Sequence, residues 1–258
     1  MSEMIRLDKF LADMSAGTRS QAKELISKGK VRLNGNIVKD ASVKLNKNTD
    51  IVEIEGVKTK YCEYEYYMLN KPAGVVSATE DKNDRTVLDL LTTKARKDLF
   101  PVGRLDKDTE GLLIITNDGE LSHMLLSPKK HVNKTYYVET DIYIDERMAR
   151  LLENGVDIGD AKPTMRAGVK VINQKNNDKA FYDSEKNVSL ITLTEGRFHQ
   201  VKRMYQAVGA KVIYLKRISM GGLKLDERLK SGEYRPLTDE EIQLLKRCVK
   251  ILREEINE

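Results

Sequence analysis

The sequence has few of the residues that build metal centres. The two cysteines, Cys62 and Cys248, lie far apart, and the three histidines are His123, His131 and His199. None of these residues form a pair with ligand spacing, so no Cys/His metal site is expected. Cysteines used so sparingly also indicate a reduced protein of the cytoplasm.

Long apolar runs and nucleotide-binding loops are also missing. No stretch approaches the length needed to span a membrane, and the N-terminus has no signal-peptide pattern. Neither a P-loop nor a dinucleotide fingerprint is present, so no nucleotide cofactor is expected. The chain has 258 residues, 40% hydrophobic and 33% charged, which leaves room for one large globular domain and a small one.

The positive charge is concentrated at one end of the chain. The net charge is +5, and residues 1–60 hold 12 lysines and arginines against 8 acidic residues. Such an excess is expected where a protein meets a polyanion. An ordinary solvated basic surface would give the same balance, so charge alone does not decide between the two.

The first sixty residues predict a small domain of two helices and a sheet. Apolar residues at helical spacing predict a helix over residues 5–14, and Thr18 with Gln21 forms a capping box for a second helix. Asn34-Gly35 between apolar residues predicts a hairpin. Further apolar residues up to Ile54 complete the sheet.

The rest of the chain predicts a second, larger domain. A polar stretch without periodicity, residues 56–65, marks the boundary, which we place after residue 60. Helices and strands are interleaved in residues 61–258 without regular βαβ spacing, which predicts an α+β fold with a mixed, mainly antiparallel sheet. Val75–Ser77 is expected to continue a strand, and residues 174–187 to form a loop.

One stretch of the second domain combines opposite charges with glycine. It reads Gly103-Arg104-Leu105-Asp106-Lys107-Asp108-Thr109-Glu110-Gly111 and leads into an apolar run that resembles a buried strand. Carboxylates at the mouth of a core strand are held rigidly from below, as at many catalytic sites. A solvated, salt-bridged surface loop is the alternative, and composition by itself favours it.

A basic helix is predicted after Gly196. One of its faces would be buried and consists of Phe198, Val201, Tyr205 and Val208. The adjacent face would present His199, Lys202, Arg203 and Gln206. Between Arg197 and Arg217 there are six lysines and arginines and no acidic residue, which argues against a merely solvated face.

Three motifs resemble a known family. The pattern Gly-Arg-Leu-Asp-x-Asp-Thr-x-Gly-Leu-Leu that begins at Gly103 resembles the central motif of RNA pseudouridine synthases, and its continuation to Leu121 resembles their small-subunit rRNA branch. The segment Asn70–Ser77 recurs in the same family. The pattern from Arg6 to Gly35 resembles the S4 RNA-binding domain. The resemblance implies a small S4 domain followed by a pseudouridine synthase domain.

The resemblance also implies catalytic roles. Asp106 would be the catalytic aspartate, Lys202 its ion-pair partner, and Tyr136 the residue that stacks on the base. Many relatives have arginine in place of Lys202, and lysine there points to the small-subunit branch. Asp108 and Glu110 are interpreted as structural residues of the loop. Whether Asp106 attacks C1′, attacks C6 or removes a sugar proton stays open.

Further residues are implied to contact the RNA. Leu215 would pack against the uracil, and Arg104 would fill the space that a flipped base leaves. Arg197, His199 and Arg203 would bind the substrate as well. In the S4 domain, phosphate contacts are expected from polar and basic residues, namely Arg6, Lys9, Arg19, Ser20, Lys23, Lys28, Lys30 and Arg32.

The resemblance finally implies a reaction and a partner. The chain would isomerise uridine to pseudouridine without cofactor or metal, in 16S rRNA at the uridine conventionally numbered 516, and would act as a monomer on that RNA or on the assembling small ribosomal subunit. The alternatives are a 23S rRNA site and a non-catalytic S4-type RNA-binding or assembly factor. The presence of Asp106, Tyr136 and Lys202 argues against a decayed enzyme.

Overall fold

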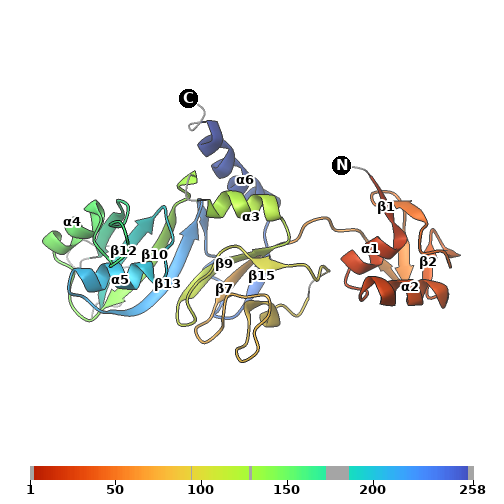
Figure 1. Ribbon diagram of the computed structural model, residues 1–258, viewed down its shortest axis with the longest axis horizontal. Helices are drawn as coiled ribbons and strands as arrows, with labels where there is room; N and C mark the ends of the chain where they lie inside the picture. The colour runs from red at the N-terminus through yellow and green to blue at the C-terminus, as the bar shows by residue number, and fades with distance from the viewer. Residues whose placement is uncertain (1–2, 94, 128–129, 173–185, 255–258) are drawn as a thin grey trace. The chain divides into compact units, whose positions relative to one another are not determined.

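The structure is a computed structural model that describes residues 3–93, 95–127, 130–172 and 186–254 (Figure 1). The chain forms two compact units. The first comprises the residues up to Glu65 together with Leu91–Leu99, and the second comprises Tyr66–Leu90 and the chain from Phe100 onward. No local pattern in the sequence predicts that Leu91–Leu99 joins the first unit, because the contacts involved are distant along the chain.

The first unit consists of two helices and two small sheets. Strand β1 pairs with β4, and the other sheet has the order β3-β2-β5-β6. The elements are β1 (Met4–Arg6), α1 (Leu7–Asp13), α2 (Arg19–Ser27), β2 (Val31–Leu33), β3 (Asn36–Ile37), β4 (Lys44–Asn46), β5 (Val52–Ile54) and β6 (Val57–Thr59).

Local signals explain much of the first unit. The capping box is confirmed, because the Thr18 hydroxyl accepts a hydrogen bond from the Gln21 amide and the Gln21 side chain accepts one from the Thr18 amide. The hairpin is confirmed as well, with φ of 51° at Asn34 and 83° at Gly35. The helix expected over residues 5–14 is wrong at its start, because β1 pairs with β4 and tertiary pairing overrides the apolar periodicity.

The segment Leu91–Leu99 is tied to the first unit by polar contacts. The Ser15 hydroxyl donates to the carbonyl of Ala95 at 2.7 Å, and the Lys97 ammonium donates to the carbonyl of Gly17 at 2.7 Å. Arg96 is buried and forms an ion pair with Asp98 at 2.6 Å. These contacts attach the later segment to the first unit.

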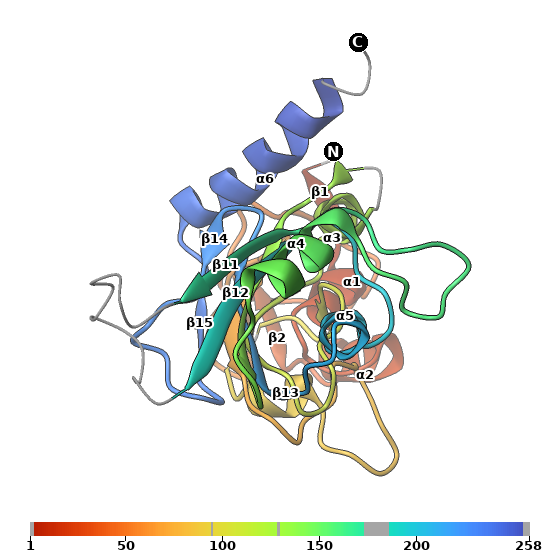
Figure 2. The ribbon, with the colours of Figure 1, turned by 90° about the vertical axis from the view of Figure 1, so that its left-hand side faces the viewer.

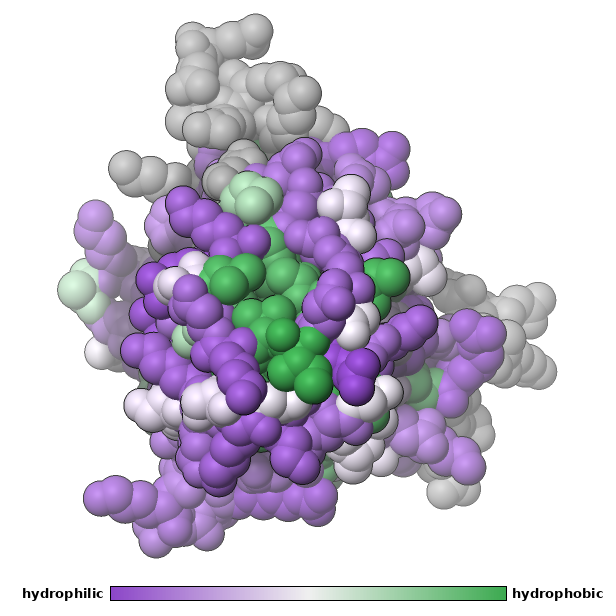
Figure 3. All heavy atoms as spheres, turned by 90° about the vertical axis from the view of Figure 1, so that its right-hand side faces the viewer, coloured by the Kyte–Doolittle hydropathy of each residue, from purple (hydrophilic) through white to green (hydrophobic). Residues whose placement is uncertain are grey.

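One face of the first unit, shown in Figure 3, has apolar side chains gathered in the middle and hydrophilic side chains around them. In or next to the two sheets of this unit, the exposed large apolar residues are Met4, Ile37, Ile51 and Val57.

The second unit is built on a nine-stranded sheet with the order β11-β12-β10-β13-β9-β7-β15; β14 pairs with β13 and β8 with β9. The strands are β7 (Tyr66–Lys71), β8 (Phe100–Pro101), β9 (Glu110–Thr116), β10 (Lys134–Thr140), β11 (Gly168–Ile172), β12 (Asn187–Leu193), β13 (Val212–Met220), β14 (Leu223–Lys224) and β15 (Tyr234–Pro236). Only β13 and β9 pair in parallel, so the predicted α+β, mainly antiparallel fold is confirmed among the described strands.

Helices cover the two halves of this sheet with separate cores. Helices α4 (Glu146–Asn154) and α5 (Gln200–Ala207) pack on the half that contains β10 and β12, as Figure 2 shows. Helices α3 (Gly119–Leu126) and α6 (Asp239–Glu254) pack with β7 and β9. No helix in the described part of the chain is long and apolar enough to cross a membrane.

Three local expectations need comment. Val75–Ser77 does not continue a strand; Val76 forms only an isolated bridge with Thr86, and a short 3₁₀ helix follows at Val87–Leu90. Phe198 is 71% exposed, so its predicted place on a buried stripe is wrong. Most of the loop expected at 174–187 lies outside the described residues.

The two halves of the sheet meet where β9 runs beside β13, and the contact requires a glycine. Gly111 has φ of 100°, and a Cβ there would lie 2.2 Å from the carbonyl oxygen of Arg217. Only glycine fits such a close approach in this conformation. The loop that precedes β9 is thereby held directly beside β13.

Candidate active site

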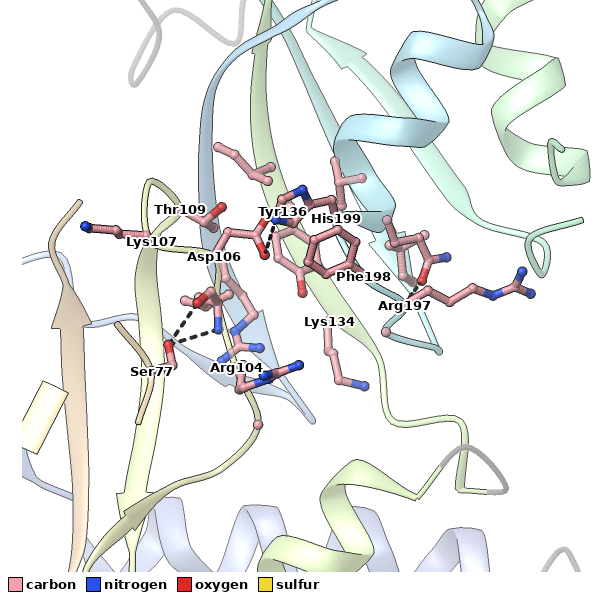
Figure 4. Close-up of a pocket in the computed structure, with 18 of the residues that line it drawn as sticks. Ser77, Arg104, Asp106, Lys107, Thr109, Lys134, Tyr136, Arg197, Phe198 and His199 are labelled. Atoms are coloured by element: carbon pink, nitrogen blue, oxygen red, sulfur yellow. Dashed lines mark hydrogen bonds and ion pairs between the residues drawn. The ribbon is translucent and has the colours of Figure 1, made fainter. Parts of the chain in front are cut away.

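A cleft of about 620 Å³ lies at this junction of the two halves. Its walls are the loop Gly103–Thr109, the segment Leu193–Val201 and residues of β10 and β13 (Figure 4). All of these belong to the second unit. The charged loop before β9 is therefore not an ordinary solvated surface loop but one wall of a concave site.

Asp106 faces a histidine and a lysine at the start of α5. Its Oδ1 lies 3.6 Å from Nε2 of His199, and its Oδ2 lies 3.4 Å from Nζ of Lys202. Lys202 is closer to Asp108, with a hydrogen bond of 2.5 Å that holds the pKa of Asp108 below its usual range. The lysine thus bridges two carboxylates of one loop.

The start of α5 places these side chains. His199 is the N-cap residue and has a left-handed backbone with φ of 48°, and its ring stacks on Phe198 at 3.8 Å between centroids. Non-glycine residues rarely adopt this conformation, and when they do it is often at functional sites. The turn brings His199 to the mouth of the cleft, and Lys202 follows within the first turn of the helix.

A buried lysine organises the loop that carries Asp106. The Lys71 ammonium donates to the carbonyls of Pro72, Asp106, Lys107 and Thr109 at 2.9 to 3.2 Å. Burial lowers the pKa of Lys71 to about 8, against the opposing effect of the loop's carboxylates. Three of these carbonyls belong to the loop, so the ammonium fixes the loop backbone at Asp106 and directly after it.

The segment after Lys71 adds two more anchors. The Ser77 hydroxyl accepts a hydrogen bond from the amide of Leu105 and donates one to its carbonyl. The amide of Gly74 donates to the carbonyl of Lys107 at 2.7 Å. The segment Asn70–Ser77 resembles a family motif, but the sequence alone indicates no role for it. In the structure it holds the loop Gly103–Thr109 in place through these hydrogen bonds.

The floor of the cleft comes from β10 and β13. Their antiparallel register sets Tyr136 opposite Arg217 and Val138 opposite Leu215, so these side chains share one face of the sheet. Tyr136 is partly buried, whereas Leu215 is 5% exposed. Lys134, two residues before Tyr136, also lines the cleft and is 7% exposed.

The predicted substrate contacts do not all reach the cleft. Arg104, His199 and Leu215 line it. Arg197 lines it as well, but its guanidinium is held by Glu195 and by the carbonyls of Lys162 and Pro163, and it points away from Asp106 in Figure 4.

Arg203 is not among the lining residues of this cleft. Its guanidinium donates to the carbonyls of Ile158 and Phe198 and forms an ion pair with Asp160 at 2.6 Å. In this geometry Arg197 and Arg203 both tie the cleft wall to the segment from Ile158 to Pro163.

The residues expected to bind RNA in the first unit are mostly exposed. Arg6, Lys28 and Lys30 form ion pairs with Asp8, Glu24 and Glu55 respectively. Within the described residues, Lys9, Arg19 and Lys23 have no ion pair. Those three charges are available to an external anion.

Sequence reasoning missed four residues of the site: Lys71, Asp108 as the partner of Lys202, Lys134 and Arg217. The sequence does contain a signal for Lys71. This lysine stands directly before proline at the end of an apolar strand, a place where a side chain is expected to be buried. No local signal marked Lys134 or Arg217, since their position on the cleft side of the sheet depends on strand register. In the described part of the chain, no group of three His, Cys, Asp or Glu residues could hold a metal ion.

Comparison with known proteins identifies the class to which this fold and site belong. The pattern of the RNA pseudouridylate synthase family matches residues 65–207, and that of the S4 domain matches residues 5–51. The chain belongs to the RNA pseudouridine synthase family and is an isomerase with an N-terminal S4 domain.

Several relatives match over nearly their whole length. An uncharacterized RNA pseudouridine synthase of Bacillus subtilis, YtzG, is 47% identical over 93% of this chain and 98% of the relative. Ribosomal small subunit pseudouridine synthase A of Haemophilus influenzae is 39% identical, with coverage of 93% and 99%. Ribosomal large subunit pseudouridine synthase B of Bacillus subtilis is 38% identical, with coverage of 94% and 96%.

The fold has an experimental counterpart. A crystal structure of a pseudouridylate synthase superposes with a TM-score of 0.63 at 38% sequence identity, and the match covers 93% of this chain and 99% of the other.

Proposed function

We propose that this protein isomerises a single uridine to pseudouridine in 16S rRNA, by resemblance the one numbered 516, as a monomer in the cytoplasm. The observation that carries the proposal is the position of Asp106, 3.4 Å from Lys202 and 3.6 Å from His199 at a cleft floored by Tyr136 and Leu215. A carboxylate beside a flat, partly apolar floor suits a sugar whose base lies flat in the cleft.

The reaction assigns a task to each of these residues. The target uridine leaves its stack and enters the cleft. Asp106 acts at the sugar or the base, Lys202 forms an ion pair with its carboxylate, Tyr136 stacks on the uracil and Leu215 packs beneath it. The N1–C1′ bond breaks, C5 joins C1′, the proton on C5 leaves and N1 gains a proton, so no cosubstrate is consumed.

The remaining predicted residues divide into two groups. Arg104 fills the space that the flipped base leaves, and His199 meets the RNA at the mouth of the cleft. Arg197 and Arg203 support the substrate indirectly, since their guanidinium groups hold the cleft wall. The S4 domain binds the phosphate backbone through its basic residues and positions the enzyme on folded RNA.

A site map of the product tests the proposal. Purified protein is incubated with prefolded 16S and 23S rRNA fragments, and pseudouridine is located by carbodiimide modification and primer extension. The expected result is one new stop in 16S rRNA, absent with Asp106→Asn. A stop at another 16S position would contradict the assignment of the uridine.

A 23S rRNA target is the second candidate. Relatives named for the small and the large subunit are 39% and 38% identical to this chain, so identity does not separate them. A stop only in 23S rRNA would support this candidate. Tight binding of RNA with no stop in either rRNA would instead favour a non-catalytic S4-type factor.

A further inference from the structure

The floor of the cleft contains two buried basic side chains on one face of the sheet. Arg217 is 2% exposed and Lys134 is 7% exposed, and both line the cleft. The strand register sets Arg217 opposite Tyr136, and Lys134 lies two residues away on the same face. Neither residue makes an ion pair within the described part of the chain. Two like charges without a carboxylate are costly to bury.

Arg217 has a buried donor nitrogen without a partner among the described residues. Arg217 donates from Nε to the carbonyl of Leu112 at 2.8 Å, but its Nη2 is buried and has no hydrogen-bond partner among the described residues. Within the described part of the chain, the one hydrogen bond of the Lys134 ammonium is to the carbonyl of Val132, at 3.0 Å. Burial and the nearby Arg217 lower the pKa of Lys134 to about 8. If these residues served only to link β13 to β9, the hydrogen bond from Arg217 Nε to Leu112 would suffice, and Lys134 would not be needed.

We propose that Arg217 and Lys134 form a subsite that binds the carbonyl edge of the flipped uracil and takes up the negative charge the base gains during the reaction. The inference rests on the proposed function. Uracil presents the acceptors O2 and O4, whereas cytosine has an amino donor at C4. Two cationic donors therefore select uracil against cytosine.

The same charge appears by every route open to Asp106. If the N1–C1′ bond breaks after attack at C1′ or loss of a sugar proton, its electron pair stays on N1 and spreads to O2 and O4. If Asp106 adds to C6, the electrons of the C5–C6 double bond move toward O4. The base becomes neutral again once C5 has joined C1′, the C5 proton has left and N1 is protonated. Fixed cations at those oxygens stabilise each intermediate.

Depth favours the base over a phosphate as the ligand. The Asp106 side chain, which must reach the sugar, is 27% exposed, whereas Arg217 and Lys134 are almost fully covered, in a cleft also lined by Leu193 and Leu215. A flipped base enters deepest, and its phosphates stay at the hydrated surface. The pair therefore lies where the edge of the base arrives, beyond the sugar.

Three variants test the subsite: Lys134→Met, Arg217→Gln and the control Lys216→Met. Lys216 neighbours Arg217 in β13 but points to the opposite face and does not line the cleft. Affinity is measured in the Asp106→Asn background for an rRNA fragment with uridine, cytidine or an abasic site at the target. Circular dichroism checks that each variant folds. If Arg217→Gln does not fold, the test rests on Lys134→Met.

The expected result is a preference for uridine over cytidine of about tenfold or more, reduced to less than about threefold by Lys134→Met and kept by Lys216→Met. With Asp106 present, Lys134→Met should slow single-turnover product formation by about a hundredfold. An unchanged preference would overturn the inference. An equal loss of affinity for all three RNAs would also overturn it, in favour of a phosphate contact. If the unsubstituted protein forms no pseudouridine in either rRNA, the proposed function fails as well.

Discussion

Lys202 donates its shortest hydrogen bond, 2.5 Å, to Asp108. Its ammonium lies 3.4 Å from Asp106, the partner that the family resemblance implies. The Asp108 side chain is 72% exposed and that of Asp106 is 27% exposed. Asp108 therefore holds the lysine at the edge of the cleft while leaving it within reach of the more buried carboxylate.

Asp106→Asn should reduce pseudouridine formation by at least about a thousandfold, because the amide can act neither as a base nor as a nucleophile. RNA affinity should change little, since the phosphate contacts lie elsewhere. Product mapping and a binding titration on the same preparation check both statements. Turnover that persists in the purified variant would remove Asp106 from the mechanism.

Lys202→Met and Asp108→Asn should distinguish the contribution of the Lys202–Asp106 ion pair from that of the Lys202–Asp108 hydrogen bond. Loss of the lysine leaves Asp106 without its cation, and single-turnover rates should fall by about a hundredfold. Loss of the exposed Asp108 carboxylate removes a pair worth little, so rates should change by less than about tenfold. Equal losses in the two variants would show that Asp108 belongs to the catalytic group.

Gly111→Ala should destabilise the second unit by about 1–3 kcal/mol or more, because φ is 100° and the new Cβ would meet the Arg217 carbonyl. Gly159→Ala is the matched control. Gly159 has φ of 80° but nothing within 4 Å of the added Cβ, so it measures backbone strain without the clash. Denaturant unfolding of both variants gives the difference, and equal losses would mean that the close approach is not tight.

Lys134→Met should be at least as stable as the unsubstituted protein at pH 7, because it removes a buried cation beside Arg217. The folded pKa of Lys134 is about 8 and its ordinary value is 10.5. Between these values the unfolded chain binds a proton that the folded chain does not, so the stability of the unsubstituted protein rises with pH. The advantage of the variant should therefore shrink from pH 8 to 10.5 in denaturant titrations. An advantage that grew with pH would contradict the assignment.

Charge removal in the first unit should weaken rRNA binding and flatten its salt dependence. Substitution is preferable to deletion, because Leu91–Leu99 packs with this unit and would lose its partners. The triple variant of Lys9, Arg19 and Lys23 to Gln should lower the slope of log affinity against log salt by about 0.7–0.9 per lost contact. The same changes at Lys39, Lys44 and Lys58 serve as the control for net charge. An identical slope in the two triple variants would mean that the first three contact no phosphate.

Local patterns predicted the parts of the fold that few neighbouring residues decide. The capping box at Thr18 and the hairpin at Asn34-Gly35 depend on groups three residues apart or fewer, and both are present. The predicted start of α1 is wrong for the opposite reason. Its apolar spacing suits a helix, but Met4–Arg6 pair with a strand some forty positions later.

The sequence by itself determined the family, the mainly antiparallel α+β fold and the presence of Asp106, Tyr136 and Lys202 within recognisable motifs, because these follow from residue identity and local spacing. Only the tertiary structure decided that Lys202 bonds Asp108, that Lys71 binds three carbonyls of the loop, and that Lys134 and Arg217 both line the cleft floor. The reason is strand register. A shift of one residue between β10 and β13 would turn Arg217 to the opposite face, and no local pattern records which register the two strands adopt.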